Sequence, residues 1–227
     1  MALKYSQVPT IAAVSGLALG GGCEIALHCT RIVAAFESYI GLVEAGVGLL
    51  PAGGGLKELA IRAVDNTPLG DPYPLLQQYF QTAAMAKVSG SAMEAREFGF
   101  LRPADVIVMH AGELLYAASR QVQALRETGY RPPLRNRVWP AGGDIAIATL
   151  KMLLVNMQEG NFISDHDNEI ASRIATVISG GGIDRGTPVS EDWYLALERQ
   201  HFAALAVQPK TIERITHTLK TGKPLRN

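Results

Sequence analysis

The stretch SGLALGGGCEIALHCT, residues Ser15–Thr30, decides how the first part of this chain folds. It places three consecutive glycines, Gly20–Gly22, between an apolar, β-branched run and an apolar pattern with helical spacing. Glycine tolerates positive φ and lets other atoms approach the backbone closely. The pattern therefore predicts a buried strand over residues 10–16, a tight turn at the glycines, and a helix that ends near Thr30. Glu24 falls one turn inside that helix.

The glycine turn has two interpretations. The first N–H groups of a helix have no intrahelical acceptor and lie at its mildly positive end, so this turn could hold an anion or an oxyanion. It could equally be a structural turn, in which glycine relieves crowding and Glu24 complements the helix dipole. A dinucleotide fingerprint is excluded because its third glycine would fall at Ile25, and a phosphate loop is excluded because no Gly-Lys-Ser/Thr is present.

A second carboxylate, Glu44, follows 20 residues after Glu24, within IGLVEAGVGLLPAGGG. A helix between two parallel strands returns the chain to the same edge of the sheet, where α/β sites usually lie. We therefore expect both carboxylates to face one pocket, an arrangement that suits proton transfer beside a carbonyl group. Spacing alone favours the alternative that Glu44 is an exposed loop carboxylate.

The remaining chain predicts more helix than strand. A second strand with a turn near Glu37–Ser38 comes from RIVAAFESYIG, and a further strand comes from ADVIVM. Helices are expected near residues 54–64, 75–87, 91–98, 144–159, 164–179, 190–206 and 208–221. Another helical pattern, with an apolar face, carries Leu114, Leu115, Ala118, Val122 and Leu125. The fold class is α/β, divided into residues 1–108 and an all-helical region over residues 109–227.

Composition excludes several classes of protein. Lys plus Arg and Asp plus Glu number 21 each in 227 residues, so no net charge attracts nucleic acid or an anionic membrane. No apolar run has the length of a membrane span. Two cysteines, Cys23 and Cys29, form no disulfide framework, which favours a reducing, cytoplasmic location. We expect no metal site, because the acids of SDHDNE are better explained as a helix start capped by Ser164.

The segments PTIAAVSGLALGGGCEIALHCTRIVAA and IGLVEAGVGLLPAGGGLKELA together resemble the crotonase superfamily, the enoyl-CoA hydratases and isomerases. The resemblance covers roughly Val8–Ala60 and continues more weakly in AMAKVSGSAMEAREFGFLRPADVIV. It is closer to bacterial fusion proteins that carry an NAD-dependent 3-hydroxyacyl-CoA dehydrogenase on the N-terminal side. The resemblance implies a partial crotonase-like core, a ββα spiral whose N-terminal repeats are missing.

The resemblance also implies roles for three residues. Gly21 would donate a backbone N–H to the thioester oxygen, Glu24 would position and deprotonate water, and Glu44 would exchange a proton with the α-carbon. Both glutamates are present, which favours a hydratase over an isomerase. The implied reaction is reversible addition of water to a trans-2-enoyl-CoA in fatty-acid β-oxidation.

Partners follow from the same resemblance. Acyl-CoA would be the substrate, this part would bind no cofactor, and NAD would belong to the missing dehydrogenase. Assembly into a homo-oligomer through the helical tail is implied as well. The family places its second oxyanion N–H upstream, where this chain has only about nine residues before the first strand. We therefore expect a C-terminal fragment that is nearly inactive alone. The alternative is a non-catalytic module that binds acyl-CoA or docks the dehydrogenase.

Overall fold

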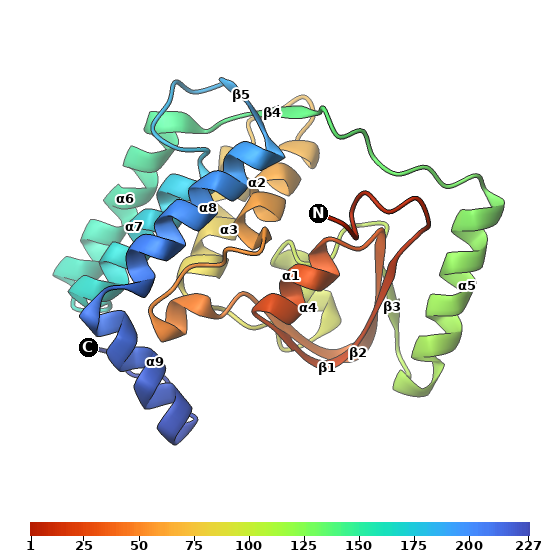
Figure 1. Cartoon of the computed structure of the whole chain (residues 1–227), viewed down its shortest axis with the longest axis horizontal. Coiled ribbons are helices and arrows are strands. Elements are labelled where there is room, and N and C mark those ends of the chain that lie inside the picture. Colours follow the sequence, from red (N-terminus) through yellow and green to blue (C-terminus); the bar gives the residue numbers. More distant parts are fainter. The chain divides into compact units, whose positions relative to one another are not determined.

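The computed structural model describes residues 1–227, which form two compact units. The first unit comprises Met1–Leu42 and Val88–Arg137, and the second comprises Val43–Lys87 and Val138–Asn227. Each unit is therefore assembled from two stretches that lie far apart in the sequence (Figure 1).

The first unit is a parallel β-sheet with helices packed against it. Its sheet has the order β1-β2-β3, and both strand pairs are parallel. The elements are β1 (Ile11–Leu19), α1 (Gly21–Leu27), β2 (Arg31–Gly41), α4 (Ala92–Glu97), β3 (Val106–Val108), the 3-10 turn η2 (Ala111–Glu113) and α5 (Leu114–Glu127). The predicted strand–turn–helix–strand order around the three glycines is confirmed.

The turn predicted near Glu37–Ser38 is wrong, because β2 runs through these positions. The pairing with β1 instead shifts its register between Val14 and Gly16, a local irregularity of the ladder. Ser38 is fully buried, and its hydroxyl lies 2.7 Å from the carbonyl oxygen of Ala35 and 3.1 Å from that of Val14. A polar residue that normally favours turns is thus satisfied inside the strand.

Helix α5 packs against β1 and β2 (Figure 1). Leu114 and Ala118 are buried with Val33 of β2, and Ile11 packs on this cluster. The predicted apolar face is therefore only partly right, because Leu115 is 76% exposed. Successive helical residues lie about 100° apart, so Leu115 cannot share the face of Leu114 and Ala118.

The second unit is built around helix α7, which contacts α2, α3, α6 and α8. Its elements are the 3-10 turn η1 (Glu44–Val47), α2 (Gly55–Asp65), α3 (Tyr73–Ala84), β4 (Val138–Pro140), α6 (Gly143–Glu159), α7 (Asp165–Ile178), β5 (Pro188–Ser190), α8 (Glu191–Ala206) and α9 (Pro209–Thr221). The four C-terminal helices agree with the predicted ranges. The antiparallel pair β4–β5 was not predicted, because each strand has three residues and includes a proline.

The two units do not coincide with the division predicted at residue 108. Helix α5 lies beyond that residue but packs on the strands of the first unit, whereas α2 and α3 lie before it and pack on α7. None of the helices combines the length and the apolar character needed to cross a bilayer.

Candidate functional site

The glycine turn connects β1 to α1 and lies beside the end of β2, the other long strand of the first unit. Gly20 has φ 53° and ψ −124°, a conformation that favours glycine. Its N–H donates to the carbonyl oxygen of Gly41, the last residue of β2, over 2.8 Å. The start of α1 is therefore fixed directly beside the end of the neighbouring strand.

The backbone at the start of α1 is open. The N–H of Glu24 makes the first intrahelical hydrogen bond, to Gly20 over 3.0 Å, so Gly21 and Gly22 donate to no carbonyl group of their own helix. Both glycines are exposed, and a Cβ added at either position would meet no heavy atom within 4 Å. The surface at Gly21 and Gly22 is therefore open to an acceptor from outside the helix.

Glu24 is buried at the same helix start, with 8% of its surface exposed. His28 lies one turn further along; its Nδ1 is 2.7 Å from the carbonyl oxygen of Glu24, so it is engaged with the backbone of its own helix. Burial raises the pKa of the Cys29 thiol, which opposes formation of a thiolate nucleophile. The carboxylate is therefore the group at this turn that is suited to proton transfer.

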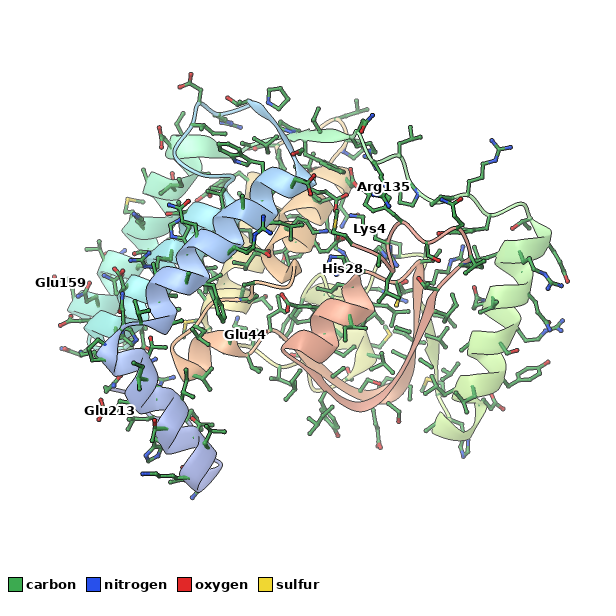
Figure 2. The ribbon with its side chains drawn as sticks, viewed as in Figure 1. Lys4, His28, Glu44, Arg135, Glu159 and Glu213 are labelled. Atoms are coloured by element: carbon green, nitrogen blue, oxygen red, sulfur yellow. The ribbon has the colours of Figure 1, made fainter.

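Glu44 begins η1, in the second unit (Figure 2). Its carbonyl oxygen accepts the N–H of Leu49 over 3.0 Å, and the turn ends at Gly48 in the left-handed conformation, with φ 88°. Glu44 is half-buried, so it is not the exposed loop carboxylate that spacing alone suggested. Alanine and glycine at positions 45 and 46 line a cavity of about 230 Å³.

The structure thus brings together two of the three predicted site residues. Gly21 and Glu24 share the first turns of α1, whereas Glu44 belongs to the other unit. The pairing of the two carboxylates around one pocket stays a prediction.

Sequence reasoning missed two buried residues next to Gly48, the residue at which η1 ends. Thr211 of α9 donates its hydroxyl to the carbonyl oxygen of Gly48 over 2.8 Å, and His166 of α7 lies 3.0 Å from the same hydroxyl. Both side chains are buried. His166 lies in SDHDNE, which was correctly interpreted as a helix start, since Ser164 caps α7 in a capping box. No local signal links this segment to residue 48.

A buried charge cluster in the second unit was also missed. The Lys57 ammonium is fully buried and lies 2.6 Å from carboxylate oxygens of both Glu58 and Glu191. Burial alone would lower the pKa of Lys57, but these two carboxylates outweigh that effect and raise it. Lys57 therefore stays charged at neutral pH, and its ion pairs join α2 to α8.

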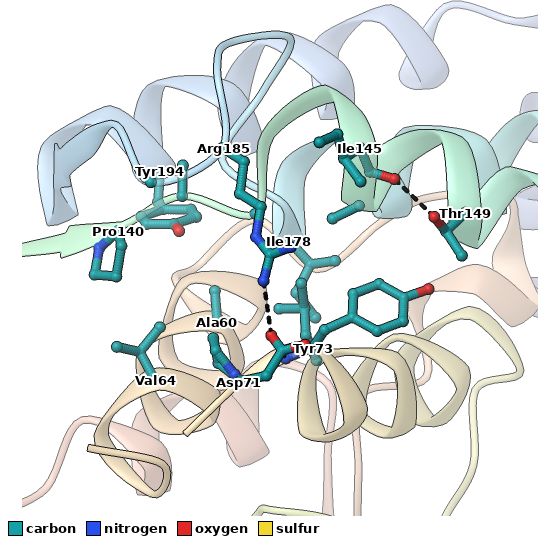
Figure 3. A pocket seen from close by; sticks show the side chains of 16 residues that line it. Ala60, Val64, Asp71, Tyr73, Pro140, Ile145, Thr149, Ile178, Arg185 and Tyr194 are labelled. Carbon is teal, nitrogen blue, oxygen red and sulfur yellow. Dashed lines mark hydrogen bonds and ion pairs between the residues drawn. The ribbon is translucent and has the colours of Figure 1, made fainter. Parts of the chain in front are cut away.

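The larger cavity of the second unit, of about 340 Å³, lies among α2, α3, α6 and the segment that precedes α8 (Figure 3). Its lining is mostly apolar, and Arg185 pairs with Asp71 across it over 3.1 Å. Thr149 donates to the carbonyl oxygen of Ile145, so its hydroxyl is engaged within α6. No residue of η1 lines this cavity.

Comparison with known proteins finds relatives of this chain, and a family profile matches the part that contains the glycine turn and Glu44. The profile of the enoyl-CoA hydratase/isomerase family matches residues 1–67. A Bacillus subtilis protein named "Probable 3-hydroxyacyl-CoA dehydrogenase" is 44% identical over 227 residues, which is all of this chain but 28% of that protein. Mouse mitochondrial methylglutaconyl-CoA hydratase is 56% identical over 52 residues, 23% of this chain and 17% of that protein. The chain thus spans about a quarter of its full-length relative.

Solved structures show the same fold at low sequence identity. An enoyl-CoA hydratase from Mycobacterium avium subsp. paratuberculosis matches with a TM-score of 0.57 and 20% identity, over 100% of this chain and 68% of that one. A carnitinyl-CoA hydratase from Mycobacterium avium matches with a TM-score of 0.55 and 21% identity, over 97% and 65%. These likenesses support the predicted α/β class and its helical C-terminal region.

Proposed function

The chain belongs to the crotonase superfamily, and on this premise we propose that it is the enoyl-CoA hydratase-type module of a β-oxidation protein. The substrate class is a trans-2-enoyl-CoA, and the reaction is reversible addition of water that gives a 3-hydroxyacyl-CoA. One observation supports the proposal: Glu24 is buried in the first turn of α1, and the first two residues of that helix, Gly21 and Gly22, are exposed and donate to no carbonyl group of the helix.

Each residue has a defined part in the proposed reaction. The Gly21 N–H donates to the thioester oxygen as negative charge develops on it, which is where a preorganised donor stabilises the transition state. Glu24 takes a proton from the water whose oxygen attacks the β-carbon. Glu44, in its protonated form, gives a proton to the α-carbon. In the reverse direction Glu44 takes that proton back and Glu24 returns its proton to the departing oxygen.

The place of each carboxylate in the sequence, shortly after the end of a strand, supports this assignment. Glu44 follows Gly41, the end of β2, by three residues, and Gly41 accepts the N–H of Gly20 at the glycine turn. The two proton-transfer groups therefore follow the ends of two paired parallel strands, the sheet edge at which α/β sites form.

We place this module at the C-terminal side of a protein that also carries the 3-hydroxyacyl-CoA dehydrogenase, which would oxidise the product with NAD. The presence of a longer protein is supported by the Bacillus subtilis relative named "Probable 3-hydroxyacyl-CoA dehydrogenase", which matches all of this chain over 28% of its own length. In the family, upstream residues supply the second oxyanion donor. Residues 1–227 alone should therefore hydrate crotonyl-CoA about 10²–10³-fold more slowly than the full-length protein. Assembly through the helical tail and a cytoplasmic location belong to the same proposal.

The test is hydration of crotonyl-CoA by the full-length protein, followed by the loss of the ultraviolet absorbance of the conjugated thioester. Glu24→Gln and Glu44→Gln should each lower kcat by about 10²–10⁴-fold. The matched controls are Glu37→Gln in the first unit and Glu159→Gln in the second, because both carboxylates are exposed. Unchanged turnover in both active-site variants would overturn the catalytic assignment and leave an acyl-CoA-binding or assembly module.

A further inference from the structure

The 3-10 turn that carries Glu44, η1, packs against two helices of the same unit, α7 and α9. Thr211, in the first turn of α9, is fully buried and donates its hydroxyl to the carbonyl oxygen of Gly48, the C-cap of η1. Because that hydroxyl hydrogen goes to Gly48, the Thr211 oxygen is left to accept the Nε2–H of His166. The result is a chain of hydrogen bonds from α7 through α9 to the turn.

The backbone of Gly48 lies close to Thr211 of α9. A Cβ added to Gly48 would lie 3.0 Å from both the Cα and the Oγ1 of Thr211. Gly48 also has φ 88°, so glycine is required here for its conformation and for the contact. The turn therefore rests directly on α9, with no side chain of its own between them.

Helices α7 and α9 are fixed to each other beside this chain. Arg214, one turn after Thr211, is 1% exposed and bonds to Asp167 over 2.7 Å. Burial, and then the nearby Arg214 and Lys210, lower the pKa of His166, so its ring is neutral at pH 7. A neutral ring has one N–H, and the Thr211 hydroxyl is its buried partner.

From this arrangement we infer that Thr211, supported by His166, is a positioning residue that sets the place of Glu44 by bonding the carbonyl group at the end of its turn. The inference rests on the proposed function, because the proton-transfer role of Glu44 is part of that proposal. Thr211 itself is assigned no contact with substrate. A general acid or base loses its effect when it is displaced by a fraction of an ångström to an ångström. Loosening the end of a four-residue turn displaces its first residue directly.

The test compares Thr211→Val with Thr211→Ser in the full-length protein, by crotonyl-CoA hydration. Valine keeps the shape and removes the donor, whereas serine keeps the hydroxyl. We expect Thr211→Val to lower kcat by about tenfold to a hundredfold with KM little changed, and Thr211→Ser to keep most of the activity. Thr82→Val is the matched control, because Thr82 is also buried in the second unit and donates to a backbone carbonyl group, that of Gln78.

A double-variant cycle separates positioning from a general loss of structure. If Thr211 acts through Glu44, Thr211→Val should have no further effect once Glu44 is glutamine. An equal fold-loss in both backgrounds, or no loss in the parent background, would overturn the inference. Full activity of Glu44→Gln itself would instead refute the proposed function. Should Thr211→Val fail to fold, Thr211→Ala against Thr211→Ser repeats the comparison, because both lose the methyl group and only alanine loses the hydroxyl.

Discussion

Replacing Gly21 by proline tests the proposed oxyanion donor without removing the helix that carries it. Gly21 is the first residue of α1, and proline is favoured there because its missing N–H has no intrahelical acceptor in any case. Proline also carries side-chain atoms, so alanine is the necessary partner: Gly21→Ala keeps the N–H, and its Cβ meets no heavy atom of the protein within 4 Å.

The expected effect follows from the loss of one donor. Removal of one oxyanion N–H costs about 10²–10³ in kcat, or about 3–4 kcal/mol of transition-state stabilisation. We expect this loss for Gly21→Pro in crotonyl-CoA hydration by the full-length protein, and less than about tenfold for Gly21→Ala. Both variants should unfold at the same urea concentration as the parent to within the error, because α1 keeps its hydrogen bonds from Glu24 onward.

Two outcomes would contradict this reasoning. Equal losses in Gly21→Pro and Gly21→Ala would mean that space at the turn matters and the N–H does not. Near-parent activity of Gly21→Pro would mean that another group binds the thioester oxygen, and the open backbone at the start of α1 would then be a structural turn.

The remaining predictions concern the second unit. Lys57→Met should lower the free energy of unfolding by about 3–5 kcal/mol in urea titrations at pH 7, because the buried Glu58 and Glu191 carboxylates lose the ammonium group that they share. A change below about 1 kcal/mol would contradict this. His166 has a lowered pKa in the folded state, so unfolding takes up a proton below the ordinary value of about 6.5, and stability is lost as the pH falls from there by up to about 1.4 kcal/mol per pH unit. His166→Gln should flatten that slope, and an unchanged slope would assign it to other groups. Gly48→Ala should lower the free energy of unfolding by about 1–3 kcal/mol or more. The loss should exceed that of Gly222→Ala, because Gly222 has a similar φ but a Cβ there would meet no heavy atom within 4 Å. Equal losses would mean that Thr211 moves aside for the added Cβ.

The first unit was readable from the sequence because its signals are local. Three glycines after an apolar run predict a strand, a turn and a helix, and Gly20 does adopt the left-handed φ that such a turn requires. The helical ranges after residue 143 were predictable for the same reason, since caps such as Ser164 and Ser190 stand next to the helices they start. The burial of Glu24 was not predicted, because the sequence does not show which face of α1 packs on β1 and β2.

The errors come where long-range packing decides the outcome. Ser38 was interpreted as a turn residue, but carbonyl groups of its own strand and of β1 satisfy its hydroxyl. Leu115 was placed on the buried face of α5 because it is apolar, whereas the sheet selects the face of Leu114 and Ala118. The division at residue 108 stays a prediction: it followed the change from mixed strands and helices to helical patterns, whereas each compact unit contains segments from both sides of that residue.

Helix α2 shows why the glycine-rich segment of residues 51–55 depends on the end of the chain. Its N-cap, Gly54, has no side chain that could accept N–H groups of the first turn. The fully buried carboxylate of Glu198 on α8 accepts the N–H groups of Gly54 and Lys57, each over 2.8 Å. The cap therefore comes from 144 residues away in the sequence. A buried helix end whose N–H groups lack acceptors costs more free energy than one hydrogen bond contributes on balance. The start of α2, with residues 51–55, therefore depends on α8 for its folded conformation.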